Sequence, residues 1–125
     1  MNDDNSMKDN IVKNKSFEFA IEIIKLYKFL CEQKKEFVMS KQLLRSGTLI
    51  GANVRESEYA ESRLDFIHKM SIALKEANES EYWLELLVQS NYLDKKLQQK
   101  INLQLTEILK LLTAIIKSSK YYKQK

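Results

Sequence analysis

This sequence of 125 residues contains no proline, two glycines, one histidine and one cysteine. The low numbers of cysteine and histidine exclude certain kinds of structure and site. The single cysteine, Cys31, cannot form an intrachain disulfide, which makes the cell interior the natural compartment. One histidine excludes a di-iron site within the subunit, because such a site needs two Glu-x-x-His pairs. No apolar run approaches the roughly 20 residues that a membrane-spanning helix needs. We therefore expect one cytoplasmic domain with no membrane partner, no metal and no cofactor.

The two glycines, Gly47 and Gly51, lie four residues apart in a segment with helical periodicity. This step places both on one helix face, where the missing side chains let another backbone approach closely. Each glycine costs about 1 kcal/mol relative to alanine inside a helix. The pair therefore predicts a helix-packing site, and Trp83 is predicted to be a core or interface anchor. The spacing fits neither a Walker loop nor a dinucleotide-binding loop.

Apolar periodicity predicts four helices and no strand. The first is expected from about residue 14 or 16 to about residue 33. Ser40 is the predicted N-cap of the second helix. Ser62, followed by Asp65 in a capping box, opens the third, and Asp94 caps the fourth. Short connections between such helices predict an all-α, antiparallel, up-down-up-down four-helix bundle.

The first helix has more apolar surface than packing on one side needs. One stripe consists of Phe17, Ile21, Ile24, Tyr27 and Cys31, and a second consists of Phe19, Ile23, Leu26 and Leu30. We expect the second stripe to bury against another copy of the chain. The bundle should therefore form a homo-oligomer.

The net charge of +4 comes entirely from the end of the chain. Residues 1–116 contain 17 basic and 17 acidic side chains. The tail then alternates cations with aromatic rings, which favours contact with RNA or DNA phosphates and bases; its candidate contacts are Lys117, Lys120, Tyr121, Tyr122, Lys123 and Lys125. Favourable placement of cations at a helix C-terminus is the alternative explanation. The expected organisation is a disordered leader at 1–13, the bundle at 14–117 and this basic tail at 118–125.

Several polar residues lie on or near helix faces that are otherwise made to pack. They are Asn53, Glu56, Lys75, Glu76 and Glu79. Two interpretations stay open: surface salt bridges worth well under 1 kcal/mol, or a buried network that fixes the register between helices or subunits.

Three residues of the third helix have the composition of a catalytic triad. Asp65, His68 and Ser71 share one face at three-residue steps. A glycine-free helix supplies neither an oxyanion hole nor a strained nucleophile turn. We therefore expect no enzymatic activity.

Two segments of this sequence resemble a known bacterial family. They are QLLRSGTLIGANVRE at 42–56 and DFIHKMSIALKEANE at 65–79, followed by Glu81-Tyr82-Trp83-Leu84. The chain is similar to the four-helix-bundle proteins called S23 ribosomal proteins or 23S rRNA intervening-sequence proteins, over about residues 16–116. The resemblance implies a barrel-shaped homo-pentamer. It extends distantly to the accessory variability protein of diversity-generating retroelements, which binds nucleic acid and a reverse transcriptase.

Two classes of function remain open at this point. One is a non-catalytic, oligomeric protein of the 23S rRNA intervening-sequence type that associates with RNA or DNA. The other is a structural or protein-interaction module that binds an unidentified protein and no nucleic acid.

Overall fold

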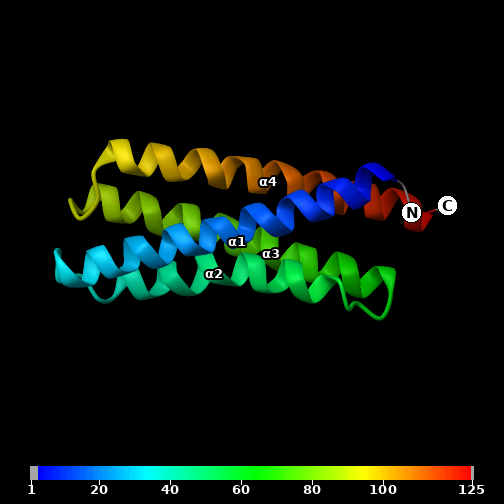
Figure 1. Cartoon of the computed structure of the whole chain (residues 1–125), viewed down its shortest axis with the longest axis horizontal. Coiled ribbons are helices and arrows are strands. Elements are labelled where there is room, and N and C mark those ends of the chain that lie inside the picture. The colour runs from blue at the N-terminus through cyan, green and yellow to red at the C-terminus, as the bar shows by residue number, and fades with distance from the viewer. Residues whose placement is uncertain (1–2, 125) are drawn as a thin grey trace.

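The computed structural model describes the chain over residues 3–124, with side chains over residues 7–121. It contains four α-helices, α1 (Asp3–Glu32), α2 (Met39–Ser57), α3 (Arg63–Gln89) and α4 (Lys95–Gln124). The helices run side by side in alternating directions, and both chain ends lie at the same end of the bundle as the α2–α3 connection (Figure 1). The predicted four-helix bundle is confirmed.

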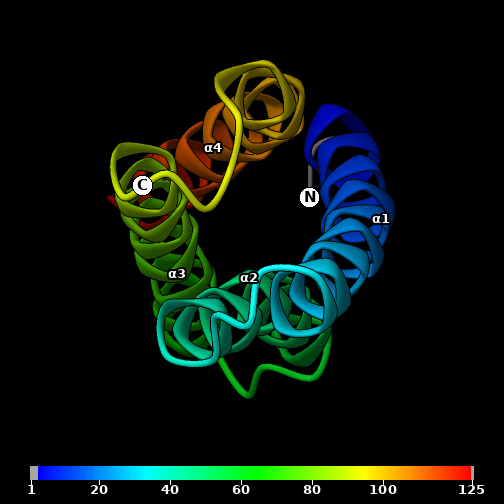
Figure 2. The same ribbon diagram turned by 90° about the vertical axis from the view of Figure 1, so that its left-hand side faces the viewer.

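Each helix touches two neighbours, so the bundle is a closed square (Figure 2). The neighbouring pairs are α1 with α2, α2 with α3, α3 with α4, and α4 with α1, and within the described residues the backbones of the diagonal pairs do not approach closely. Every helix consequently has one face toward the core, two flanks toward its neighbours and one outer face. The outer faces are where this chain can meet other molecules.

Side-chain caps define where the helices start. Ser62 accepts a hydrogen bond from the backbone N–H of Asp65 at 3.0 Å, and Asp94 accepts one from Leu97 at 2.7 Å, as predicted. The predicted Ser40 cap of α2 is wrong. Instead, the Glu36 carboxylate accepts from the N–H groups of Val38, Met39 and Ser40 at 2.7 to 3.0 Å. A glutamate just before the helix satisfies several of the donors that an N-terminus leaves open.

The ends of the chain differ from the predicted leader and tail. α1 begins at Asp3 instead of near residue 14, and Val12 is fully buried in the core. Most of segment 1–13 is therefore helical, while residues 1–2 lie outside the described residues. α4 extends through Gln124, and Ser119 is buried. The predicted basic tail is thus the last two turns of α4, with Lys125 outside the described range.

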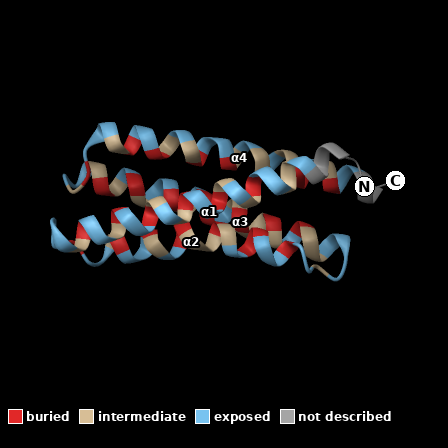
Figure 3. Cartoon of the chain, viewed as in Figure 1, coloured by how far each residue is buried: buried red, intermediate tan, exposed pale blue. Residues whose placement is uncertain are grey.

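Buried and exposed positions alternate along α1 (Figure 3), and the two apolar stripes of this helix have the opposite roles to those predicted. The second stripe, at Phe19, Ile23, Leu26 and Leu30, is 0 to 5% exposed and forms part of the chain's own core. Phe17, Ile21 and Ile24 of the first stripe point outward. Periodicity shows that a helix has two apolar faces, but it contains no information on which one meets the other three helices.

Both glycines of α2 face α1. A Cβ atom at Gly47 would lie 2.9 Å from Cγ2 of Ile23, whereas one at Gly51 would lie 3.4 Å from the carbonyl oxygen of Ser16. A hydrogen-bonded pair of buried hydroxyls, Ser46 and Ser80 at 2.9 Å, lies where α2 meets α3. Small residues thus line both flanks of α2.

No helix within the described residues is both long enough and apolar enough to cross a bilayer.

Candidate functional site

The outer face of α1 carries an apolar strip, which we call the α1 stripe and define as Phe17, Ile21 and Ile24. These side chains are 54%, 40% and 38% exposed. They follow i, i+4, i+7 spacing, so they form one continuous row about two turns long. The Arg55 guanidinium of α2 lies 5.7 Å from the centre of the Phe17 ring, within range of a cation–π interaction. A row of large apolar groups facing away from the core is a surface that another apolar surface can cover.

A second feature, the arginine cluster, joins α2 to α3 through Arg45, Glu76 and Glu79. Nη1 of Arg45 lies 3.5 Å from Glu76 and 3.3 Å from Glu79. Glu76 is buried, and its Oε1 atom has no hydrogen-bond partner even though Arg45 is close. Trp83 is half-buried, packs against the core and directs its indole N–H toward Glu79 at 3.5 Å. The cluster fixes one flank of the bundle by charge as well as by packing.

Of the five predicted network residues, the structure brings together only Glu76 and Glu79. Asn53 is buried but donates to the carbonyl of Leu49 within its own helix, at 2.9 Å. Glu56 is exposed and lies 4.0 Å from Lys69. Lys75 is exposed, and Glu79 is paired with Arg45 instead of with this neighbouring lysine.

Sequence reasoning missed Arg45, the residue that links the cluster. Its partners are 31 and 34 positions away, so no local spacing marks it. The available signal was weak: an arginine directly before Ser46 and Gly47, next to the small-residue face of α2.

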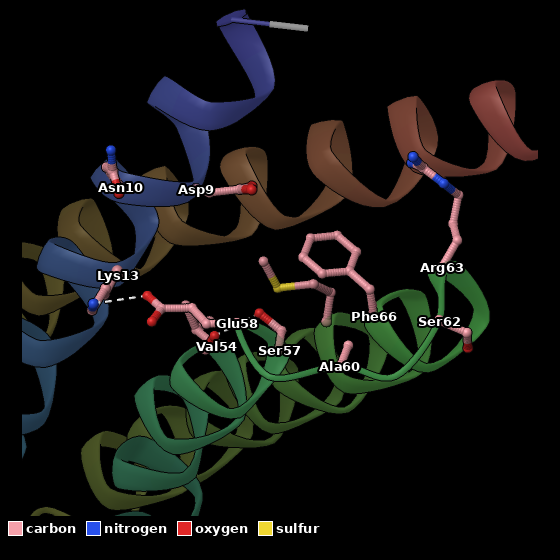
Figure 4. A pocket seen from close by; sticks show the side chains of 11 residues that line it. Asp9, Asn10, Lys13, Val54, Ser57, Glu58, Ala60, Ser62, Arg63 and Phe66 are labelled. Carbon is pink, nitrogen blue, oxygen red and sulfur yellow. Dashed lines mark hydrogen bonds and ion pairs between the residues drawn. The ribbon is translucent and has the colours of Figure 1, made fainter. Parts of the chain in front are cut away.

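A hollow of about 670 Å³ lies at the end of the bundle that holds both chain ends (Figure 4). Its apolar lining includes Val54, Phe66 and Met70. Charged groups at its rim include Lys13 of α1, which pairs with Glu58 at 2.7 Å. We call this hollow the end pocket. Because it is open to solvent, it offers a shallow, mixed surface rather than an enclosed substrate cavity.

Asp9 is the most perturbed acid of this pocket. Burial, with a smaller contribution from the negative charge of Glu58, raises the pKa of Asp9 from 3.8 to about 6. Its Oδ1 atom is buried without a hydrogen-bond partner. Removal of the Asp9 carboxylate from water disfavours its charged form, and the nearby negative charge of Glu58 adds a smaller effect in the same direction.

The outer face of α4 is lined with lysines. Lys96, Lys100, Lys110, Lys117 and Lys120 are all exposed, and we call them the α4 lysine row. Tyr121, at the end of the row, is 57% exposed. The other predicted nucleic-acid contacts, Tyr122, Lys123 and Lys125, have side chains outside the described residues.

The triad-like residues of α3 do not assemble into a catalytic arrangement. Oδ2 of Asp65 accepts a hydrogen bond from the backbone N–H of Glu61 at 3.1 Å, so this carboxylate completes the helix cap. His68 is exposed on the same helix. In the part of the chain that the structure describes, no group of three His, Cys, Asp or Glu side chains is placed to hold a metal ion.

Comparison with known proteins supports the four-helix bundle and identifies the family. The family model described as 23S rRNA-intervening sequence protein matches residues 8–114. The fold is similar to the crystal structure of a protein of unknown function from the S23 ribosomal protein family of Bacteroides thetaiotaomicron. That protein is 64% identical, with a TM-score of 0.87, and the match covers 88% of this chain and 98% of the other. No curated protein matches. A family match over most of the sequence, supported by the same fold at high identity, leads to one conclusion: this chain belongs to the 23S rRNA-intervening sequence protein family.

Proposed function

We propose that this chain is a non-catalytic, self-associating bundle that attaches to nucleic acid through the end of α4. The observation that carries the proposal is the α1 stripe. Its three large apolar side chains remain between 38% and 54% exposed, opposite the face that builds the core. Covering each of these half-exposed side chains would contribute about 1 kcal/mol. A second copy of the chain is a partner present wherever the protein is made.

The expected assembly is a closed ring. The resemblance to barrel-shaped homo-pentamers favours five copies, for which the expected mass is about 74 kDa, five times 14.8 kDa. In a ring each copy uses two different surfaces, so the stripe of one copy would pack against another face of the next.

Self-association is tested by placing charge on the stripe. Ile21→Glu combined with Ile24→Glu should reduce the mass measured by light scattering at micromolar concentration from that of the oligomer to that of the monomer. Leu64→Glu is the matched control, because Leu64 is also an exposed apolar residue, at 59%, on α3. Circular dichroism should show helical content retained in both variants. A monomeric wild-type protein would overturn the proposal.

The nucleic-acid part of the proposal depends on the last turns of α4. Lys117 and Lys120 are exposed there, and Tyr121 presents part of its ring to solvent. Lysines at a helix C-terminus also interact favourably with the helix dipole, so some of this charge serves stability. What favours a further role is the combination of several cations with aromatic rings, which suits both phosphates and bases.

Binding is tested by fluorescence anisotropy with labelled single-stranded RNA. The triple variant Lys117→Gln, Lys120→Gln, Lys123→Gln should bind more weakly than a control in which Lys28, Lys41 and Lys75 become Gln. For three phosphate contacts, raising salt from about 50 to about 200 mM should weaken wild-type binding roughly 20-fold. No binding at the lower salt would favour the alternative, a protein-interaction module without nucleic-acid binding.

A further inference from the structure

The charge of this chain is divided unevenly between its helices. Residues 1–94 contain 13 basic and 16 acidic side chains, a net charge of −3, whereas residues 95–125 contain eight lysines and one acid, a net charge of +7. The edge of the bundle formed by α4 therefore carries more positive charge than the net +4 of the whole chain, and the remainder of the molecule is weakly acidic. Summing the charge over residues 1–116 hides this division, because the lysines of α4 cancel the acids of α1 and α3.

The positive charge of α4 is available to solvent. The helix turns Ile101, Leu105, Ile108 and Leu112 toward the core and leaves the α4 lysine row on its outer side. None of these five lysines forms an ion pair with a carboxylate of the described residues. The only acid of the helix, Glu107, is paired with Lys15 of α1 at 2.7 Å. Glu107 lies on the same outer face as the row, three residues before Lys110, but it is paired with Lys15, so the five lysines of the row are left without an acidic partner of their own among the described residues.

The row is long. From Lys96 to Lys120 the helix rises about 36 Å, which is close to the length of one turn of a nucleic-acid duplex, about 34 to 36 Å. Lys96, Lys110 and Lys117 stand at multiples of seven residues, so they lie nearly in line along the helix. A straight rod with cations along this length can follow a polyanion of the same scale.

The chemistry of the row favours a duplex over a single strand. No aromatic residue occurs between Lys95 and Lys120, whereas proteins that bind single strands stack the bases on aromatic side chains. Apart from Tyr121 at its end, the row has no stacking partner, so its ammonium groups are suited to phosphates rather than to the faces of bases. Its attraction is greatest where phosphates are densest, and a duplex carries one charge for every 1.7 Å or so of its axis.

We propose that the α4 lysine row binds the phosphate backbone of double-stranded nucleic acid, so that the binding surface is the whole outer face of α4. This inference rests on the proposed function and names the class of partner that it would bind. It also gives Lys96, Lys100 and Lys110 a role, although the sequence pattern pointed only to the end of the chain. Because phosphates are common to RNA and DNA, both duplexes should bind.

The test compares the full-length wild type with two triple variants that lose the same charge. In the row variant Lys96, Lys100 and Lys110 become Gln; in the control Lys28, Lys41 and Lys75 become Gln. The probes are labelled RNA and DNA duplexes of about 20 base pairs, roughly two helical turns, and the corresponding single strands. At about 100 mM salt the row variant should lose tenfold or more in duplex affinity, and its salt slope should fall by about 3. The control should change less than threefold.

Each other result has a definite meaning. All six substituted lysines are exposed, so thermal melts should show folded proteins, and Lys→Arg at the three row positions should keep binding. Equal affinities of row variant and control, or tighter binding of single strands than of duplexes, would overturn this inference while leaving the proposed function intact. A tenfold preference for one kind of duplex would overturn the restriction to phosphate contacts. Failure of the wild type to bind any probe at about 50 mM salt would remove the proposed nucleic-acid function as well.

Discussion

Gly47 and Gly51 have different surroundings although they share one face of α2. A Cβ atom at Gly47 would meet Cγ2, Cγ1 and Cβ of Ile23 at 2.9, 3.0 and 3.3 Å. Ile23 is fully buried and branched at Cβ, so these atoms cannot move aside without a shift of α1. At Gly51 the nearest atoms belong to Ser16 and lie 3.4 Å or more away, which is ordinary contact. Only Gly47 has no room for a methyl group.

Alanine substitution should therefore act in opposite directions at the two positions. Gly47→Ala should lower the free energy of unfolding by about 1 to 3 kcal/mol through overpacking. Gly51→Ala should raise it by up to about 1 kcal/mol, because alanine is the better helix former. Urea denaturation of the two variants beside the wild type measures both changes. Shifts of the same sign and size would contradict this account of the α1–α2 contact.

The half-buried carboxylate of Asp9 lowers the stability of the folded protein at neutral pH. Its pKa, raised from 3.8 to about 6, means that the folded protein holds this proton more tightly than the unfolded chain does. Stability from this group is consequently greatest at low pH and is lost as pH rises from about 4 to about 6. A change of this size in the pKa corresponds to about 3 kcal/mol of stability for a fully buried group, and the partial exposure of Asp9 reduces the effect to about 1 kcal/mol.

Asp9→Asn should accordingly stabilise the protein at neutral pH. The expected gain is about 1 kcal/mol at pH 7 and close to zero below pH 4, where the wild-type carboxyl is protonated in both states. Thermal melts between pH 3.5 and 7.5 provide the comparison. A variant that is less stable than the wild type at pH 7 would indicate that the Asp9 charge is stabilised by a partner.

At the scale of the element, the start of α2 depends on a residue three positions before the helix. Burial would raise the pKa of Glu36, but the N–H groups of Ser40, Met39 and Val38 and the Ser40 hydroxyl together lower it below its ordinary value. The folded state therefore favours the ionised form. Stability from this cap is present above about pH 4.5 and is lost as the pH falls below that value. Lys35, with a φ of 55°, makes the left-handed turn that brings Glu36 back toward the helix.

Glu36→Gln should lower the free energy of unfolding by about 0.5 to 2 kcal/mol at pH 7, the usual range for loss of a capping side chain. Glu32→Gln is the matched control, because Glu32 is an exposed carboxylate on the other side of the same turn. The difference between the two variants should shrink as the pH falls below about 4.5. Chemical denaturation at pH 7 and pH 3.5 tests both statements. Equal stabilities of the two variants at pH 7 would show that the Glu36 cap does not stabilise α2.

At the scale of the whole molecule, repulsion between the lysines of α4 lowers the stability of the fold. Lys96 and Lys100 are four residues apart, and Lys117 and Lys120 are three apart, so each pair repels by a few tenths of a kcal/mol. The ion pairs elsewhere are mostly exposed, as Lys13 with Glu58 is, and such pairs stabilise little. The net effect of these charges on stability should therefore be repulsive.

Added salt should accordingly stabilise the free protein while it weakens any binding to nucleic acid. Between about 10 and 200 mM NaCl we expect the free energy of unfolding to rise by about 0.5 to 1 kcal/mol, because screening acts on the exposed lysines of α4. The variant with Lys96, Lys100 and Lys110 changed to Gln should lose most of this salt dependence. A melting temperature that falls with salt would mean that the attractive ion pairs dominate.

Sequence alone determined the class of fold, because helical periodicity, short connections and the caps at Ser62 and Asp94 are local properties of the chain. It also indicated Gly47 and Gly51 as one face of one helix. The start of α1 was missed since the polar residues before Val12 lack an apolar period, yet they continue a helix that the buried Val12 holds in place. The Glu36 cap was missed because its carboxylate reaches back to the helix from a turn.

Only the tertiary structure decided which residues of α1 face the core, since Ile23 and Ile24 are equally apolar and differ in what the other three helices place beside them. The same holds for Arg45, whose carboxylate partners lie on another helix. The division of charge can be counted from the sequence, but the fold shows that the lysines of α4 form one exposed surface, because the helix turns Ile101, Leu105 and Ile108 inward. Local spacing fixes periodicity and caps, whereas contacts between residues far apart in sequence fix which face is buried and which remains available to a partner.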